Sequence, residues 1–223
     1  MALMLRVEYN MISKPVMSPT EEEDFFWNAI EKSNRSQSSH WSDYNIEEHL
    51  ENLIGLLSHH TKEELIIFEK VFQEKMYELY TANIAELSII LENGYTTEEG
   101  KIIFDDYIST DGFIYFRCWL ILKGKQFFEE ITEDINAFIN GKYSFDIGDT
   151  WAEGLLYVSD EAYSANHENQ DNSEIQDAVA NLFPDVIHYD SLDGDMDGVP
   201  IGGEDLQDTY PQLVKEITDL RNK

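Results

Sequence analysis

Apolar residues recur at helical spacing through most of the chain. Ser18-Pro-Thr-Glu21 is a capping-box pattern with proline at the first helical position, and it predicts a helix that buries Phe25, Phe26 and Ile30. A second capping box, Thr61 to Glu64, predicts a long helix. Further helical patterns cover Ile46 to Leu57, Ile84 to Leu91, Ile175 to Leu182 and Pro211 to Leu220. Together they predict a mainly α protein, folded as a compact multi-helix globular domain.

The middle of the chain carries its longest apolar run. Asp111 to Leu122 is almost continuously apolar or aromatic, and we expect one central, buried helix that continues through Gly124 to Phe128. Tyr95 to Tyr107 is expected to be a loop or a small β-hairpin insertion, because it contains the β-prone run Lys101 to Phe104.

Another helix is expected after Asp149, with this aspartate as its cap and with Trp151, Leu155 and Leu156 facing inward.

The expected organisation is a leader followed by one domain. Residues 1–17 form either a disordered tail or a short strand. Residues 18–223 are expected to form a single helical domain with an acidic C-terminal segment at about 143–214. A chain of 223 residues buries enough surface to fold without disulfides or a metal, so no cofactor is required.

Charge excludes several classes of partner. The chain has 15 basic and 45 acidic residues, a net charge of −30. Between Lys142 and Lys215 there is no lysine or arginine, whereas 17 carboxylates lie from Asp146 to Asp208. Such a surface repels phosphate, so we expect no nucleic-acid partner and no anionic membrane partner. The carboxylates serve either solubility or docking of a basic protein.

The location expected from the sequence is the cytoplasm. Cys118 is the single cysteine and lies within the apolar run, so it is interpreted as a buried small hydrophobe. The apolar stretch Met1 to Leu5 is shorter than a signal-peptide core, and no run approaches membrane-spanning length.

The central run also carries a resemblance. Ser109-Thr-Asp-Gly-Phe-Ile-Tyr-Phe-Arg-Cys-Trp-Leu-Ile-Leu-Lys-Gly124 resembles the signature S-D-D-G-F-x-Y-F-R-x-W-L-I-x-x-G of a bacterial family known as domain of unknown function 4240. The likeness spans roughly residues 20 to 215, and flanking matches include Phe26-Trp27, Leu156-Tyr-Val158 and Tyr210-Pro-Gln-Leu213. Thr110 departs from the first of the paired aspartates, and residues 95–108 resemble an insertion. The family implies no established activity, and a role in binding or regulation fits it as well as any other.

The same run contains candidate ligand-pocket residues: Asp111, Tyr115, Arg117 and Trp119. An arginine inside an apolar run needs a carboxylate partner or a pocket mouth, because an unpaired buried guanidinium is costly. The favoured interpretation is a structural ion pair, with Asp111 capping the helix. The alternative is an anion-binding arginine in a pocket.

An acidic loop near the C-terminus fits the spacing of a calcium-binding loop. Carboxylates at positions 1, 3, 5 and 12, glycine at position 6 and a carbonyl at position 7 give the candidate ligands Asp193, Asp195, Asp197, Val199 and Glu204. Pro200 weakens the match, since it occupies position 8 and lacks a backbone donor. Calcium is the one candidate cofactor, and a flexible acidic loop is the default.

The sequence contains no zinc-binding spacing, glycine-rich phosphate loop or nucleophile elbow, so no catalytic residue is assigned. The leading hypothesis is a non-enzymatic binding protein for a basic protein, most concretely an immunity protein that neutralises a bacterial toxin. Candidate contact residues are Asp149, Trp151, Glu153, Asp160, Glu161, Asp185, Tyr189 and Asp190, with Trp151 and Tyr189 as exposed aromatic anchors. The alternatives are a regulator or enzyme with a pocket around Arg117, and a calcium-binding module.

Overall fold

The structure is a computed structural model that describes residues 17–34, 44–105, 107–139, 150–167, 173–192 and 205–222. It confirms the predicted fold class, because the described residues are mainly helical with one small hairpin. The leader at residues 1–16 lies outside the described part. The elements are α1 (Pro19–Ser33), α2 (Ile46–Leu57), α3 (Lys62–Glu78), α4 (Ala82–Glu92), β1 (Tyr95–Glu98), β2 (Lys101–Phe104), α5 (Thr110–Leu122), α6 (Lys125–Glu133), η2 (Ile135–Ile139), η3 (Glu153–Tyr157), α7 (Val158–Ser164), α8 (Glu174–Leu182), η4 (Tyr189–Leu192), α9 (Leu206–Thr209) and α10 (Pro211–Arg221).

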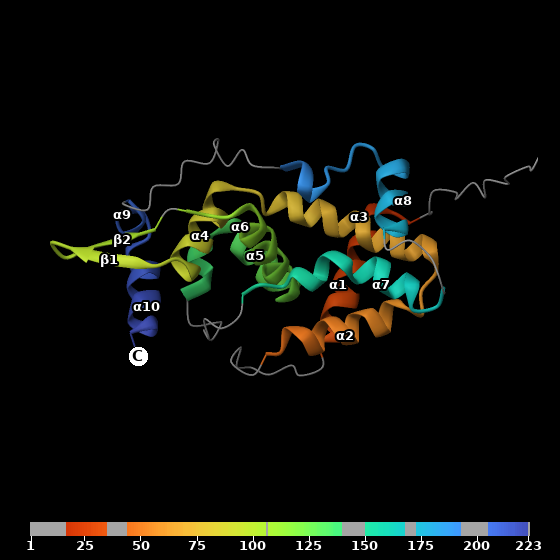
Figure 1. The fold of residues 1–223 in the computed structure, drawn as a ribbon, viewed down its shortest axis with the longest axis horizontal. Coiled ribbons are helices and arrows are strands. Elements are labelled where there is room, and N and C mark those ends of the chain that lie inside the picture. Colours follow the sequence, from red (N-terminus) through yellow and green to blue (C-terminus); the bar gives the residue numbers. More distant parts are fainter. Residues whose placement is uncertain are drawn as a thin grey trace, which may run out of the picture.

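The helices are arranged along an elongated body, shown in Figure 1. Helix α3 follows the long axis and packs against α1, α7 and α8 toward one end of the molecule. Helix α5 lies in the middle, and the hairpin with α9 and α10 forms the opposite end. The core therefore runs along α3 and α5, with η3 and α7 covering one side of it.

Both predicted capping boxes are confirmed. The Ser18 hydroxyl accepts the amide of Glu21 at 3.4 Å, and the Glu21 carboxylate accepts the amide of Ser18 at 2.8 Å. Thr61 and Glu64 make the same reciprocal pair at 3.3 and 2.9 Å. These bonds satisfy amides that a helix start leaves without intrahelical partners.

Helix α5 is the central buried helix, with ten of its thirteen residues buried. Its cap differs from the prediction. Ser109 accepts the amide of Gly112 at 3.0 Å, whereas Asp111 is already inside the first turn and exposed. The expectation that Asp111 caps the helix is wrong, because a serine two residues earlier takes that position.

The predicted continuation of this helix through Phe128 is also wrong. Helix α5 ends at Leu122, and α6 begins at Lys125. Gly124 separates them with a φ of 92°, a conformation that costs little only in glycine. The chain turns there, so the amphipathic α6 packs back on α5 rather than extending it.

The expected hairpin is present. Strands β1 and β2 pair antiparallel, with Tyr95 opposite Phe104 and Glu98 opposite Lys101. The two turn residues, Glu99 and Gly100, both have positive φ, as a type I′ turn requires. The Gln207 side chain accepts the amide of Ile102 at 2.6 Å, which attaches the hairpin to α9.

The helix expected after Asp149 begins as the 3₁₀ helix η3 and continues as α7. Asp149 lies outside the described residues. Leu155 and Leu156 are buried as predicted, but the inward orientation predicted for Trp151 is wrong, since this side chain is 55% exposed. Trp151 precedes η3 and therefore lies outside the face that the helix buries.

Candidate functional site

An exposed aromatic group lies where η3 meets α5. Trp151 and Tyr157 are 55% and 45% exposed, and the Trp151 ring packs edge-on against the half-buried Tyr115 with centroids 5.9 Å apart. The amide of Ala152 donates to the carbonyl of Tyr115 at 3.3 Å, which fixes the approach to η3 on α5. This hydrogen bond places the start of η3 beside Tyr115, with Trp151 at the surface.

Glu153 lies at the centre of this group. Its carboxylate accepts the Tyr157 hydroxyl at 3.3 Å and is close enough to the Tyr115 phenol to shift its pKa. Partial burial, Glu153 and then Asp111 raise the pKa of Tyr115 to about 12. Burial, followed by Glu153, also raises the pKa of Tyr157. Both phenols therefore remain protonated at neutral pH, and the Tyr157 hydroxyl orients the carboxylate by donating to it.

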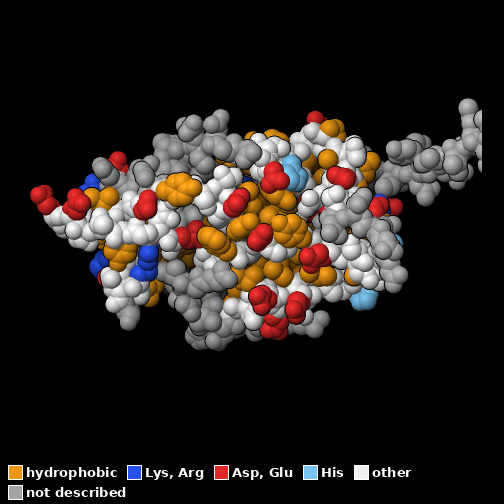
Figure 2. All heavy atoms as spheres, in the orientation of Figure 1, with side chains coloured by type: hydrophobic (Ala, Val, Ile, Leu, Met, Phe, Trp, Pro, Cys, Tyr) orange, Lys and Arg blue, Asp and Glu red, His pale blue; other side chains and the backbone are white. Residues whose placement is uncertain are grey.

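Further carboxylates surround the aromatic group. Asp111 and Asp190 are exposed and close enough to raise the pKa of Tyr157, while Glu161 lines a pocket together with Tyr157. We refer to the whole set as the aromatic–acidic surface, which consists of Asp111, Tyr115, Trp151, Glu153, Tyr157, Glu161 and Asp190. Figure 2 shows hydrophobic side chains gathered in the middle of this face, with carboxylates around them.

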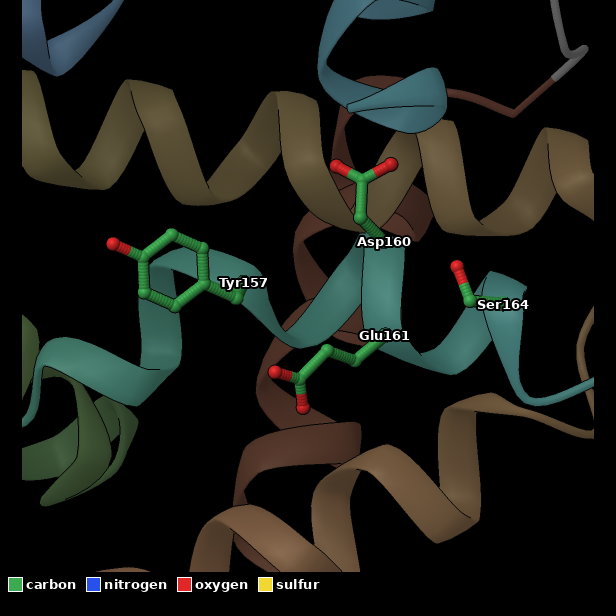
Figure 3. A pocket seen from close by; sticks show the side chains of 4 residues that line it. All are labelled: Tyr157, Asp160, Glu161 and Ser164. Carbon is green, nitrogen blue, oxygen red and sulfur yellow. The ribbon is translucent and has the colours of Figure 1, made fainter. Parts of the chain in front are cut away.

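The pocket at the edge of this surface measures about 200 Å³ and is lined by Tyr157, Asp160, Glu161 and Ser164. In Figure 3, Asp160 and Glu161 point to opposite sides of α7, with Asp160 directed toward α8. Asp160 accepts the amides of Ile175 at 2.7 Å and Gln176 at 3.4 Å. Burial raises its pKa, and the two amides act in the opposite direction. Asp160 thus satisfies amides at the start of α8, and the exposed Glu161 is the pocket carboxylate that remains accessible to a ligand.

A buried polar network lies beneath α7. Glu69 of α3 is 1% exposed, and its carboxylate accepts the Ser159 hydroxyl at 2.6 Å and the Gln73 amide at 2.9 Å. Burial raises the pKa of Glu69 to about 7. An acid with a pKa near neutrality inside a protein is a feature of many functional sites, although structural networks produce it as well.

The structure separates the predicted pocket residues. Asp111 and Tyr115 belong to the aromatic–acidic surface, but Arg117 and Trp119 are 1% and 3% exposed and belong to the core. Arg117 donates to the carbonyl of Met76 at 2.8 Å and to that of Phe113 at 3.3 Å.

The Arg117 guanidinium also lies over the rings of Tyr80 and Phe113, at 5.2 and 4.8 Å from their centroids. The predicted carboxylate partner is wrong for the described part of the chain, where carbonyls and aromatic faces take its place. Burial lowers the pKa of Arg117 to about 10, which still leaves it charged near neutral pH.

The predicted contact residues differ in their exposure. Trp151, Glu153, Glu161, Asp185 and Asp190 are exposed, as docking requires. Tyr189 is only 5% exposed and packs against Phe72, so the prediction that it is an exposed anchor is wrong. Asp160 is 3% exposed for the reason given above.

Asp149 and the whole candidate calcium loop, Asp193 to Glu204, lie outside the described residues. The residues that are described hold no cluster of three or more potential metal ligands. None of the described helices is long and apolar enough to cross a membrane.

Sequence reasoning missed Glu69, Ser159 and Tyr157. A signal for Glu69 was present, because its position four residues after Leu65 and three before Phe72 places a carboxylate on the apolar face of α3. The sequence carries no comparable signal for Ser159, whose role depends on α7 packing against α3.

Comparison with known proteins gives one match. No curated protein and no solved structure matches the chain. The model of a family described as a protein of unknown function, DUF4240, matches residues 21–165. The match runs from the first turn of α1 to the end of α7 and includes the central run Ser109 to Gly124, but it ends before Tyr210 to Leu213. The chain therefore belongs to the DUF4240 family.

Proposed function

We propose that this protein is a non-enzymatic, cytoplasmic binding protein that engages a basic protein through its aromatic–acidic surface. Its most concrete form is an immunity protein that neutralises a basic bacterial toxin by protein–protein contact. The observation that carries the proposal is the exposure of Trp151 and Tyr157 around the oriented carboxylate of Glu153.

This arrangement suits an arginine or lysine of a partner. A guanidinium can pair with Glu153 while its plane lies on the Trp151 or Tyr157 ring, which combines charge pairing with a cation–π contact. Exposed tryptophan and tyrosine are the side chains most enriched among residues that dominate binding energy. The surface therefore offers both an apolar centre and charge complementarity.

The net charge of −30 supports fast association with a basic partner. Carboxylates at the rim attract a cationic surface over a distance and raise the association rate, an effect that salt weakens. The buried position of Cys118, whose pKa is raised by burial, fits a cytoplasmic protein that does not rely on thiol chemistry.

The test begins with affinity capture from the encoding organism at low and high salt, followed by binding measurements with the purified partner. Trp151→Ala should weaken binding at least about tenfold, as expected for a central aromatic contact. Glu153→Gln should weaken binding and reduce its dependence on salt. Glu98→Gln is the matched control, because Glu98 is an exposed carboxylate in the distant hairpin.

If Trp151→Ala and Glu153→Gln bind the partner as tightly as the wild-type protein, the proposed surface is wrong. If the captured protein is not basic and its binding is insensitive to salt, the proposed class of partner is wrong.

A further inference from the structure

The pocket along α7 offers hydrogen-bond acceptors that the described part of the chain does not use. Its lining residues Tyr157, Glu161 and Ser164 are spaced four and three residues apart, so they follow one face of the helix. Among the residues that the structure describes, neither the Glu161 carboxylate nor the Ser164 hydroxyl has a hydrogen-bond or ion-pair partner. Both groups are therefore free to accept from a ligand.

The size of the pocket limits what can enter it. Its volume of about 200 Å³ is smaller than the roughly 300–1,000 Å³ of sites that hold drug-sized molecules. Tyr157, which is 45% exposed, contributes an aromatic ring to the lining. The pocket therefore suits a single side chain or a group of similar size.

The charges around the pocket favour a cation. Burial is the main cause that raises the pKa of Asp160, and the charges of Asp177 and Glu174 raise it further, which places these carboxylates nearby. Lys62 pairs with Glu174 and does not line the pocket. With Glu161 in the lining, carboxylates outnumber this lysine, so a positively charged group is attracted.

The arrangement of the two free acceptors favours a guanidinium over an ammonium. Glu161 and Ser164 are about 4.5 Å apart along the axis of α7, and in Figure 3 Glu161 extends back toward Tyr157. A guanidinium carries five donors in a planar fork, so it can pair with a carboxylate, reach a second acceptor and lie on an aromatic ring at the same time. An ammonium is a compact point charge that does not match this spread of groups.

We propose that this pocket binds the guanidinium of an arginine side chain, with Glu161 as its charge partner, Ser164 as a further acceptor and Tyr157 as the ring beside it. That the arginine belongs to the basic partner rests on the proposed function. The Tyr157 hydroxyl donates to Glu153, so the pocket adjoins that carboxylate. The partner then presents two neighbouring basic residues, one to Glu153 and an arginine to Glu161.

Free amino-acid derivatives test the pocket without the partner. N-acetylarginine amide carries the proposed side chain, N-acetyllysine amide has the same charge without the fork, and N-acetylcitrulline amide is a neutral isostere of arginine. Each is titrated into the whole protein while NMR follows the backbone amides of α7. The arginine derivative should shift these amides saturably. It should bind at least about tenfold tighter than the citrulline derivative, which lacks charge-assisted bonds, and about threefold tighter than the lysine derivative.

Two variants test the assigned residues. Glu161→Gln keeps the size of the side chain but removes its charge, so binding of the arginine derivative should weaken at least about tenfold. Ser164→Ala removes one acceptor and should weaken binding about threefold. Glu98→Gln, an exposed carboxylate of the hairpin, is the matched control and should bind as the wild-type protein does. No saturable shift, equal affinity for the arginine and citrulline or lysine derivatives, or unchanged binding in Glu161→Gln overturns the proposal.

Binding of the captured partner separates this proposal from the proposed function. A basic partner that is weakened by Trp151→Ala but not by Glu161→Gln supports the proposed function and contradicts an arginine in the pocket. A partner weakened by both variants supports both proposals.

Discussion

Ser159 donates a 2.6 Å hydrogen bond to the carboxylate of Glu69, and both side chains are 1% exposed. The contact joins α7 to α3 across a sequence separation of 90 residues. The stability of the contact between these two helices therefore depends on whether Glu69 is protonated.

The stability of the protein should depend on pH through Glu69. The pKa of Glu69 is about 7 in the folded protein, above its ordinary value of 4.5. The folded state therefore binds the proton more tightly, and the resulting stability is full below about pH 4.5 and lost as pH rises through 7. Glu69→Gln mimics the protonated acid and should remove this loss, which is on the order of 2–3 kcal/mol between pH 5 and 8.

Urea unfolding at pH 5 and 8 measures the effect, as the difference between variant and wild type. His49 has the opposite effect on stability, because burial lowers its pKa to about 4 and its contribution is lost as pH falls. Such groups cancel in the difference because both proteins contain them. Glu63→Gln is the control on the exposed side of α3. Equal pH slopes for Glu69→Gln and wild type would show that Glu69 titrates normally.

Arg117 should stabilise the fold through its contact with the end of α3. Its 2.8 Å bond satisfies the carbonyl of Met76 near the C-terminal end of α3, where helix carbonyls lack intrahelical partners and a cation is favoured. Arg117→Met removes the donor from a buried acceptor and should lower the free energy of unfolding by about 2–4 kcal/mol. Arg117→Lys keeps a cation and should lose less. Chemical denaturation measures the free energy of unfolding of each variant. A loss below about 1 kcal/mol for Arg117→Met would contradict a structural role.

Glycine at position 112 should be required by the cap of α5. A Cβ at Gly112 would lie 2.7 Å from the Ser109 hydroxyl oxygen that caps α5. Gly112→Ala should therefore displace the cap and cost about 1–2 kcal/mol, despite the better helix propensity of alanine.

Gly55→Ala in α2 is the matched control, since nothing lies within 4 Å of its added Cβ, and it should stabilise by up to about 1 kcal/mol. Thermal unfolding compares the two. If Gly112→Ala is also stabilising, or if its cost is unchanged in a Ser109→Ala background, the cap is not the cause.

Two adjacent carboxylates of α7 should differ in their contribution to stability. Asp160 accepts two amides at the start of α8, so Asp160→Ala should cost about 1–2 kcal/mol and speed hydrogen exchange in α8. Its exposed neighbour Glu161 should tolerate alanine within about 0.5 kcal/mol. Comparable losses in the two variants would show that burial does not distinguish these residues.

Local patterns predicted the helices well, because capping boxes and apolar spacing act over a few residues, as at Ser18 and Thr61. The apolar pattern wrongly predicted that α5 continues through Phe128, because it does not reveal that Gly124 has a positive φ and ends the helix. The exposure of Trp151 and the burial of Tyr189 depend on how η3 and η4 pack, which spacing does not encode. Arg117 was correctly expected to need partners, but carbonyls and rings were not anticipated because they come from α3 and from the helix's own turn.

The placement of the basic residues has a consequence for how copies of the protein behave toward one another. Arg117 lies in the core, Lys123 lies between two rings, and further lysines lie against carboxylates, namely Lys62, Lys70, Lys75, Lys101, Lys125 and Lys215. Cations held in this way are poorly placed to attract the acidic surface of a second copy. Copies of the protein should therefore repel each other at low salt. Their acidic surfaces then remain available to a basic protein even when the protein is abundant.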